Sequence, residues 1–445
     1  MRTKTHDTSA YGVEYVSGLL RMESKRTISQ ISRQVGVTSQ NMQQFISDSP
    51  WSGPGLIAEV QEQVSQHPVW EQGAMLVLDE SADEKGGETS VGASRQHNGR
   101  LGKVDVCQVG VFAALVTPEV NTWVDGELFI PEKWFEPQAS AKRKRLGIPA
   151  ERTFQTKPQL AGTLILRAGA KGLPFVAVDM DALYGRNREL CAQLEQANIE
   201  YYGDIPADTI VYLQKPTIEW PLTKRGKPAK QFRIVSDQRY EVRHLLSQPD
   251  LSWVRLTLRP CERGELVADF ARCRVWLVDE TGQPYQRWLL IRRQAKQVTY
   301  TLSNAAEETS LQTMAWRKSH RYFIERSNQD AKSELGWDEF QAIKYTAWQH
   351  HLALTILASW FIADTRLDWM ARHQRDPHLL AQFQTDVLPL LSVANVRHLF
   401  RAALPLPQLS PAAATALVIE HLINRTRSRS SRLRKLRLHH RPPET

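Results

Sequence analysis

Three acidic residues of this sequence stand where a carboxylate could bind a metal ion. Asp79 follows the apolar run Leu-Val-Leu, and Asp181 closes the apolar stretch Phe-Val-Ala-Val-Asp-Met-Asp. Burying a carboxylate at the end of a strand is costly unless a cation compensates its charge, and strand ends are where ligands of α/β sheets collect. Glu325 is the third acid. Each of them alone could equally cap a loop or a helix, so the interpretation depends on all three.

Two of these positions have a second acid nearby. Because side chains alternate along a strand, Asp179 and Asp181 face the same side, whereas Glu80 faces away from Asp79. The spacing of the residues does not choose between Asp179 and Asp181.

Glu325 lies among cations on what the sequence predicts to be one face of a helix. Lys318 and Arg321 precede it by seven and four residues, and Lys332 follows it by seven, so in a helix all four side chains lie within roughly 60° of one another. On a bare surface this would be an exposed salt bridge worth about a few tenths of a kcal/mol. Beside two acidic strand ends, the pattern indicates a metal-binding carboxylate flanked by cations that bind DNA phosphates.

The elements that must position these acids follow an α/β order. Between residues 71 and 210 the pattern predicts three strands, a helix, a strand, a helix and a strand, which is the order of an RNase H-like core and also fits other mixed α/β folds. A β-rich insertion is expected at 211–304, and the helical part of the core, with Glu325, at 305–375. The predicted fold class is therefore α/β, an RNase H-like mixed sheet interrupted by a β-rich insertion, with helical regions at both ends.

The two helical ends are expected to contact DNA. Residues 1–70 are predicted to be a helical DNA-binding region, because ISRQVGVTSQNMQQFI (31–46) fits a helix-turn-helix, although a small helical bundle with a glycine turn fits it too. Residues 376–445 are predicted to be a helical C-terminal region with a basic tail. From Arg425 to Arg441 this tail has seven arginines, one lysine and no acid, which predicts a flexible arm that pairs with phosphates, or a solvated tail.

Length and composition limit the class of protein. A chain of 445 residues exceeds the size at which single cores stop growing, so two or three domains are expected. With 42% hydrophobic and 24% charged residues it is typical of globular proteins, and the net charge of +9 favours a polyanionic partner. The apolar run 352–363 is too short to cross a bilayer, the N-terminus lacks a secretory signal, and the four spaced cysteines suggest reduced thiols. We expect a cytoplasmic, nucleoid-associated protein without a membrane partner.

The three acids resemble the DDE triad of transposases from bacterial insertion sequences. The segment around Glu325 is similar to their Tyr-x2-Arg-x3-Glu-x6-Lys signature, which Arg321, Glu325 and Lys332 match. Lys318 departs from it, because it stands at the tyrosine position. Further likeness to the branch numbered seven hundred and one runs from YVSGLL through LDES, FIPEKW, FQTKP and DALYG to HHLAL, and so covers most of the chain except the tail.

This resemblance selects among the alternatives. DALYG has the family form Asp-x-x-Tyr-Gly and points to Asp181, while LDES points to Asp79 rather than Glu80. Relatives use a tryptophan of the insertion to stack a flipped base, and Trp288 resembles that residue. An ordinary core tryptophan is an equal alternative for Trp288.

The resemblance implies a DNA transposase that cuts the inverted-repeat ends of its element and joins them to target DNA. Asp79, Asp181 and Glu325 would bind two Mg²⁺ ions, with Mn²⁺ as a substitute. The residues expected to contact the DNA are Arg321, Lys332, Lys318 and Trp288. A homodimer bridging two ends in a synaptic complex is expected. The alternatives are a domesticated transposase that only binds DNA, and an RNase H-like nuclease without strand transfer.

Overall fold

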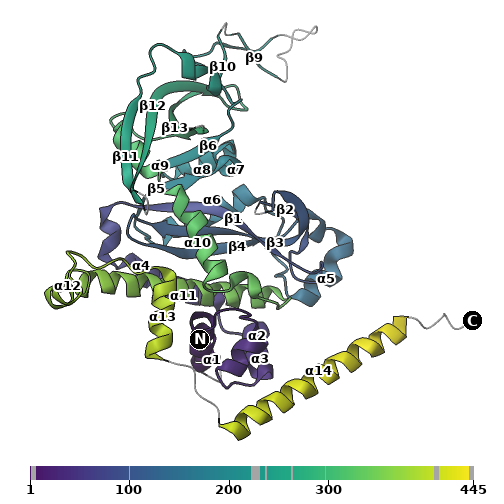
Figure 1. Ribbon diagram of the computed structural model, residues 1–445. Helices are drawn as coiled ribbons and strands as arrows, with labels where there is room; N and C mark the ends of the chain where they lie inside the picture. Colours follow the sequence, from purple (N-terminus) through teal and green to yellow (C-terminus); the bar gives the residue numbers. More distant parts are fainter. Residues whose placement is uncertain are drawn as a thin grey trace, which may run out of the picture.

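One large mixed sheet runs through the molecule and contains most of its strands (Figure 1). The computed structural model describes residues 1–445 except 2–6, 100, 222–230, 236–237, 262–263, 296, 405–409 and 440–445. The sheet has ten strands, with the order β11-β12-β13-β14-β6-β5-β1-β3-β2, and β4 also pairs with β3. The two halves of this order correspond to an insertion and a core.

The core half of the sheet has the RNase H-like topology that the sequence predicted. Its strands are β1 (Ala74–Glu84), β2 (Ser94–Asn98), β3 (Lys103–Val116), β4 (Asn121–Phe129), β5 (Phe175–Met180) and β6 (Tyr201–Ile205). β1, β3 and β4 form an antiparallel meander, β5 pairs parallel to β1, and β6 pairs parallel to β5. The short β2 is an additional strand, which pairs with the first part of β3.

The long strands of the predicted β-rich insertion are part of the same sheet, whereas its short strands form two separate two-stranded sheets. Its long strands are β11 (Val254–Cys261), β12 (Gly264–Val278), β13 (Pro284–Gln294) and β14 (Gln297–Ser303), and its short strands are β7 (Ile210–Val211), β8 (Ile218–Glu219), β9 (Arg233–Ile234) and β10 (Tyr240–Glu241). β14 pairs antiparallel with β6, so the insertion extends the core sheet at that edge. It also has a small hydrophobic cluster of its own, which includes Val242, Leu289 and Ile291.

Helices cover the two faces of the core sheet (Figure 1). One face packs against α6 (Lys157–Ala170), which lies beside α8 (Arg188–Gln196); the other packs against α10 (Arg321–Ser333) and α11 (Tyr345–Arg372). The remaining helices of this region are α5 (Ser140–Leu146), α7 (Ala182–Gly185) and α9 (Leu311–Lys318), with the 3₁₀ helices η1 (Pro68–Gln72), η2 (Glu132–Trp134), η3 (Pro137–Ala139), η4 (Val242–Ser247) and η5 (Trp337–Glu339).

Four helices form the N-terminal region, and they pack onto the long helix α11. They are α1 (Ser9–Arg21), α2 (Ile28–Gln34), α3 (Ser39–Ser47) and α4 (Gly53–Ser65). α2 and α3 are joined by a tight turn in which Gly36 has a φ of +74°, and the Thr38 side chain caps α3, so this pair has the helix-turn-helix form. The Tyr15 hydroxyl lies 3.0 Å from Nδ1 of His351 in α11, and both residues are buried.

The C-terminal region is helical, with α12 (Pro377–Phe383), α13 (Val393–Ala403) and α14 (Pro411–His439). The expectation of a flexible arm from Arg425 onward is wrong for its described part, because α14 continues through it to His439; the end of the arm lies outside the described residues. Arginine, leucine and lysine are good helix formers, and this stretch has no glycine or proline to interrupt the helix. Among the described residues, no helix is long and apolar enough to span a membrane.

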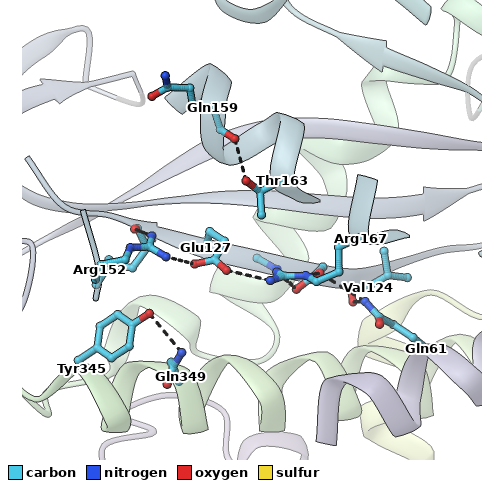
Figure 2. A network of polar contacts seen from close by, with 12 residues as sticks. Gln61, Val124, Glu127, Arg152, Gln159, Thr163, Arg167, Tyr345 and Gln349 are labelled. Atoms are coloured by element: carbon cyan, nitrogen blue, oxygen red, sulfur yellow. Dashed lines mark hydrogen bonds and ion pairs between the residues drawn. The ribbon is translucent and has the colours of Figure 1, made fainter. Parts of the chain in front are cut away.

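A polar network fixes the edge strand β4 between α4 and α6 (Figure 2). Arg167 of α6 donates two hydrogen bonds to the buried Asp125, at 2.6 and 2.9 Å, and one to Glu127 at 3.0 Å. Arg152 donates to Glu127 at 3.2 Å, and Gln61 of α4 donates to the Val124 carbonyl at 3.0 Å. The buried carboxylate is therefore compensated by a bidentate arginine, which makes this cluster structural.

Candidate active site

The three predicted acids lie together beside β1 and β5, two adjacent inner strands of the core sheet. Asp79 lies in β1, Asp181 directly follows the last residue of β5, and Glu325 lies in α10, which packs on β1. β1 and β5 are parallel neighbours, with Val77 opposite Asp179, so the residues two positions further along, Asp79 and Asp181, are also adjacent. Adjacent parallel strands thus bring the first two acids together, and the helix adds the third.

Arg321 lies among these carboxylates. Its Nη2 atom is 4.0 Å from Oδ2 of Asp79, 3.9 Å from Oδ2 of Asp181 and 3.5 Å from Oε1 of Glu325. One guanidinium nitrogen is therefore the point on which all three acids converge. Glu325 is the most accessible of the three, with 57% of its side chain exposed.

Burial makes the two strand acids resist ionisation. The pKa of Asp79 is raised to about 7, chiefly by burial and also by the nearby charges of Asp181 and Glu80, although Arg321 opposes the shift. Burial also raises the pKa of Asp181. An additional cation beside these carboxylates would stabilise their ionised forms.

A pocket of about 960 Å³ opens beside the three acids, and we call it the acidic pocket. Its lining includes Asp79, Asp181, Glu325, Asn328 and Lys332. Lys332 lies two turns after Glu325 on α10, and its ammonium donates a 2.5 Å hydrogen bond to the Ala82 carbonyl of β1. The sequence expectation that Arg321, Glu325 and Lys332 share one side of a helix therefore agrees with their arrangement around this site.

The DALYG segment holds Asp181 in position. Asp181 caps the short helix α7, because its Oδ1 accepts hydrogen bonds from the backbone N–H groups of Leu183 (2.8 Å) and Tyr184 (3.4 Å). Its other oxygen remains turned to Arg321. The glycine of the motif permits close packing, since a Cβ on Gly185 would lie 2.3 Å from the Asp204 carbonyl oxygen of β6. The segment thus fixes the carboxylate through local backbone geometry.

Glu80 is held by partners of its own. The Tyr184 hydroxyl donates to it at 2.8 Å, and the Lys157 ammonium of α6 lies 3.0 Å from it. Sequence reasoning missed these two partners, although both belong to motifs, DALYG and FQTKP, that were noted there. Their presence leaves Asp79, rather than Glu80, as the β1 acid that faces Arg321.

Lys318 does not share the helix of Glu325, which corrects the expectation of one continuous face. α9 ends at Lys318 and α10 begins at Arg321, because the side chains of Ser319 and His320 both bond back to the Trp316 carbonyl, at 2.7 and 2.8 Å. Lys318 is only 5% exposed.

The Lys318 ammonium forms two buried ion pairs beneath the site. It lies 2.6 Å from Oδ1 of Asp179 and 3.0 Å from Oδ1 of Asp204. Asp179, the alternative to Asp181 in the sequence, is fully buried and turned toward this lysine. No local sequence pattern singles out Asp204, because its contact with Lys318 depends on the pairing of β6 with β5.

Trp288 lies away from the three acids, in β13. It is 9% exposed, its indole N–H donates to the Ala306 carbonyl at 3.3 Å, and the guanidinium of Arg272 lies 4.3 Å from its ring. Trp288 does not line the acidic pocket, and it does not line a second pocket that lies on the insertion side of Glu325. This environment is that of a core strand tryptophan, one of the two alternatives for this residue.

The donor set around Arg321 fits a divalent cation of the magnesium type. All candidate ligands are carboxylate oxygens, which Mg²⁺ and Mn²⁺ prefer. As the side chains stand in the described part of the chain, no three acidic, histidine or cysteine side chains are close enough to hold one ion. However, three carboxylates lie within 4.0 Å of one cationic nitrogen, so their negative charges are gathered around one point.

Comparison with known proteins assigns the chain to a family. The profile described as DDE superfamily endonuclease matches residues 2–265, a span that contains Asp79 and Asp181 and ends before Glu325. The chain is also similar to the "Probable transposase for insertion sequence element IS701" of Microchaete diplosiphon, with 24% identity over 333 residues, which cover 72% of this chain and 73% of the relative. The family profile covers more than half of the chain, and the chain therefore belongs to the DDE superfamily endonucleases.

Proposed function

We propose that this endonuclease is a DNA transposase that cuts the inverted-repeat ends of its own insertion sequence and joins them to target DNA. The observation that carries the proposal is the convergence of Asp79, Asp181 and Glu325 on Arg321 beside the inner strands β1 and β5 of an RNase H-like sheet. Similarity to a probable transposase over 72% of the chain supports it.

The three acids are the proposed metal ligands. Asp79, Asp181 and Glu325 would hold two Mg²⁺ ions, or Mn²⁺ in their place, and bound ions of this kind activate a water and stabilise the leaving 3′ oxygen. Asp181 enters this role with its orientation fixed by the α7 backbone, and Glu80 is kept out of it by Tyr184 and Lys157. No covalent enzyme intermediate is required.

Cations beside the acids are the proposed DNA ligands. Arg321 and Lys332 flank Glu325 on α10, and both present donors that suit a phosphodiester. The residues of α3 that are exposed on the helix-turn-helix, Gln40, Asn41, Gln43 and Gln44, carry amides of the kind that read adenine in the major groove. We propose that α3 contacts the element end in this way, and that two copies of the chain bridge two ends as a homodimer.

Two buried residues, Lys318 and Trp288, are not proposed to contact DNA in their present positions. Lys318, with its two buried ion pairs, would position the turn between α9 and α10 instead of contacting phosphate directly. A stacking role for Trp288 would require the ring to leave its contacts with Arg272 and Ala306.

A cleavage assay tests the proposal. Purified protein, Mg²⁺ and a labelled duplex carrying the element end and its flank should give a strand break at the junction on a denaturing gel. Asp181→Asn and Glu325→Gln should each lower the rate by at least about 10³-fold, because a metal ligand is lost. Glu189→Gln, which changes an exposed acid of α8, is the matched control and should cut at the normal rate. Full cleavage by either site variant would refute the assignment.

Strand transfer needs a second assay. Pre-cleaved ends incubated with a supercoiled target plasmid should yield joined products if the protein is a transposase. Cleavage without any joined product would instead favour a nuclease of the same fold.

A further inference from the structure

A second pocket meets the acidic pocket at Glu325, on the side of the insertion. We call it the arginine pocket. It has a volume of about 430 Å³, and its lining includes Arg259, Arg292, Gln294, Arg321, Tyr322 and Glu325. Two strands of the insertion, β11 and β13, therefore supply cations to a hollow that adjoins the candidate metal ligands.

The arginines of this pocket have unused hydrogen-bonding capacity. The Nε atoms of Arg259, Arg292 and Arg321 are each shielded from solvent and lack a hydrogen-bond partner. Among the described residues, no carboxylate forms an ion pair with Arg259 or Arg292. Arg259 and Arg292 are half-buried, and a shielded N–H group without a partner is costly, so an anion that accepts from these groups would offset that cost.

The acids of the pocket are already used. Asp204 bonds to Lys318 and accepts a 2.6 Å hydrogen bond from Thr301, and Glu325 lies beside Arg321. Burial lowers the pKa of Arg292, and the neighbouring cation Arg259 lowers it too, although Asp204 opposes the shift. The two arginines thus repel each other, and an anion placed between them would be attracted by both.

Local structure holds the two guanidiniums in place. That of Arg259 lies over the rings of Tyr322 and Phe323, at 4.8 and 5.0 Å from their centroids. The register of β11 shifts against β12 between Thr257 and Arg259, a bulge of the kind that redirects a side chain. Arg292 bonds to the side chain of Gln294, which lines the same pocket. Arginines restrained in this way lose less freedom when they bind a phosphate.

We propose that the arginine pocket binds backbone phosphates of the DNA strand next to the scissile bond, through Arg259 and Arg292. The proposal rests on the proposed function, since it needs a DNA strand in the adjoining acidic pocket. A polyanionic strand fits better than a small anion, because the two pockets share Glu325 in their linings and an extended strand can occupy both at once. The insertion would then be a part of the DNA-binding surface.

Binding measurements on Arg259→Gln and Arg292→Gln test this site. Both are made in an Asp181→Asn background, so that the labelled duplex with the element end is bound and not cut. Each substitution should weaken binding about tenfold and lower the slope of log K against log salt by about 1, because one phosphate contact is lost. Arg259→Lys and Arg292→Lys should recover part of the affinity.

Arg293→Gln is the matched control. Arg293 is the next residue of β13, points to the other side of the sheet, and pairs with Asp269 at 3.6 Å. Its substitution should leave the affinity and the salt slope unchanged. A normal salt slope for both Arg259→Gln and Arg292→Gln would overturn the proposal, as would an equal loss in Arg293→Gln.

Replacement of single DNA phosphates by uncharged methylphosphonates locates the phosphates that the arginine pocket contacts. Single methylphosphonate links are placed one at a time beside the cleavage junction. At one or two positions the link should weaken binding by the protein that retains Arg259 and Arg292. At the same positions it should not change binding by the Arg259→Gln/Arg292→Gln double variant. If no position is sensitive, the proposal is wrong. If protein with intact acids neither binds nor cuts the ends, it is the proposed function that fails; normal cutting together with insensitive phosphates removes the arginine pocket alone.

Discussion

At the scale of single residues, the buried carboxyl of Asp79 lowers the stability of the folded protein as the pH rises. Its pKa of about 7 lies above the ordinary value of 3.8, so the folded protein binds this proton more tightly than the unfolded chain. The stabilisation from this group is complete below about pH 4 and is lost as the pH rises toward 7. At pH 8 the metal-free protein therefore has a nearly buried charge that Arg321 and the backbone N–H of Glu80 offset in part.

The substitution Asp79→Asn tests this balance. The amide cannot ionise, so at pH 8 the metal-free variant should be more stable than the parent, by up to about 4 kcal/mol if the whole shift is recovered. At pH 4 the difference should disappear. The thermal midpoint at the two pH values measures it.

Added metal should act in the opposite direction at pH 8, because it should stabilise the parent protein rather than the variant. Mg²⁺ or Mn²⁺ should raise the thermal midpoint of the parent at pH 8 and have little effect on Asp79→Asn, which has lost a ligand. A parent protein that is indifferent to both metals, or a variant that is less stable at pH 8, would contradict the assignment of Asp79.

At the scale of elements, the position of β4 depends on polar contacts between residues far apart in the sequence, which local sequence patterns do not predict. The register of β3 and β4 shifts between Ala113 and Ala114. As a result Trp123 reaches Asn328 of α10 on one face, at 3.0 Å, while Asp125 reaches Arg167 of α6 on the other. The edge strand is thereby tied to α10, which carries Glu325.

Arg167→Met tests the contribution of this tie. The change leaves the buried Asp125 without its bidentate partner, so the free energy of unfolding should fall by about 3–5 kcal/mol. Thr163→Ala on the same helix removes an exposed hydrogen bond to the Gln159 carbonyl, seen in Figure 2, and should cost less than about 0.5 kcal/mol. Urea titrations of both variants measure the two values. Equal losses would mean that the network is not the source of the stability.

At the scale of the whole molecule, basic residues lie at both the site and the C-terminal end. The chain has a net charge of +9, and the last described helix, α14, leads into and through the arginine-rich stretch that begins at Arg425. Figure 1 shows α14 as a long single helix clear of the sheet. A cationic helix of this length offers charge to duplex DNA without needing to read its bases.

Removal of residues 411–445 should therefore weaken DNA binding in a salt-dependent way. The deletion takes away seven arginines and one lysine between residues 425 and 441, so the slope of log K against log salt should become shallower by several units. Cleavage of the ends at low salt should persist, because the three acids and Arg321 remain. Fluorescence anisotropy over a range of salt measures the slope, and removal of only 442–445 is the control. An unchanged slope would exclude α14 from the DNA-binding surface.

The sequence by itself determined the order of the core elements and the positions of the candidate acids. The apolar run that ends in Asp181 predicted a strand end, which β5 confirms, whereas Asp79 lies inside β1, which continues to Glu84. The helical stripe predicted that Arg321, Glu325 and Lys332 share one side of a helix. Such patterns are local, since a period of 2 or 3.6 residues and an acid at the end of an apolar run are visible without knowing what packs against them. The triad's catalytic role stays a prediction.

Only the tertiary structure decided which charges meet. The end of α9 at Lys318 depends on the bonds of Ser319 and His320 to one carbonyl, and it turns an expected DNA contact into a buried partner of Asp179 and Asp204. The arginine pocket needs the insertion to continue the core sheet through β14 and β6, and a bulge to aim Arg259. Contacts between residues far apart in the chain depend on strand register and on helix ends, which shift by single residues for reasons that local sequence patterns do not contain.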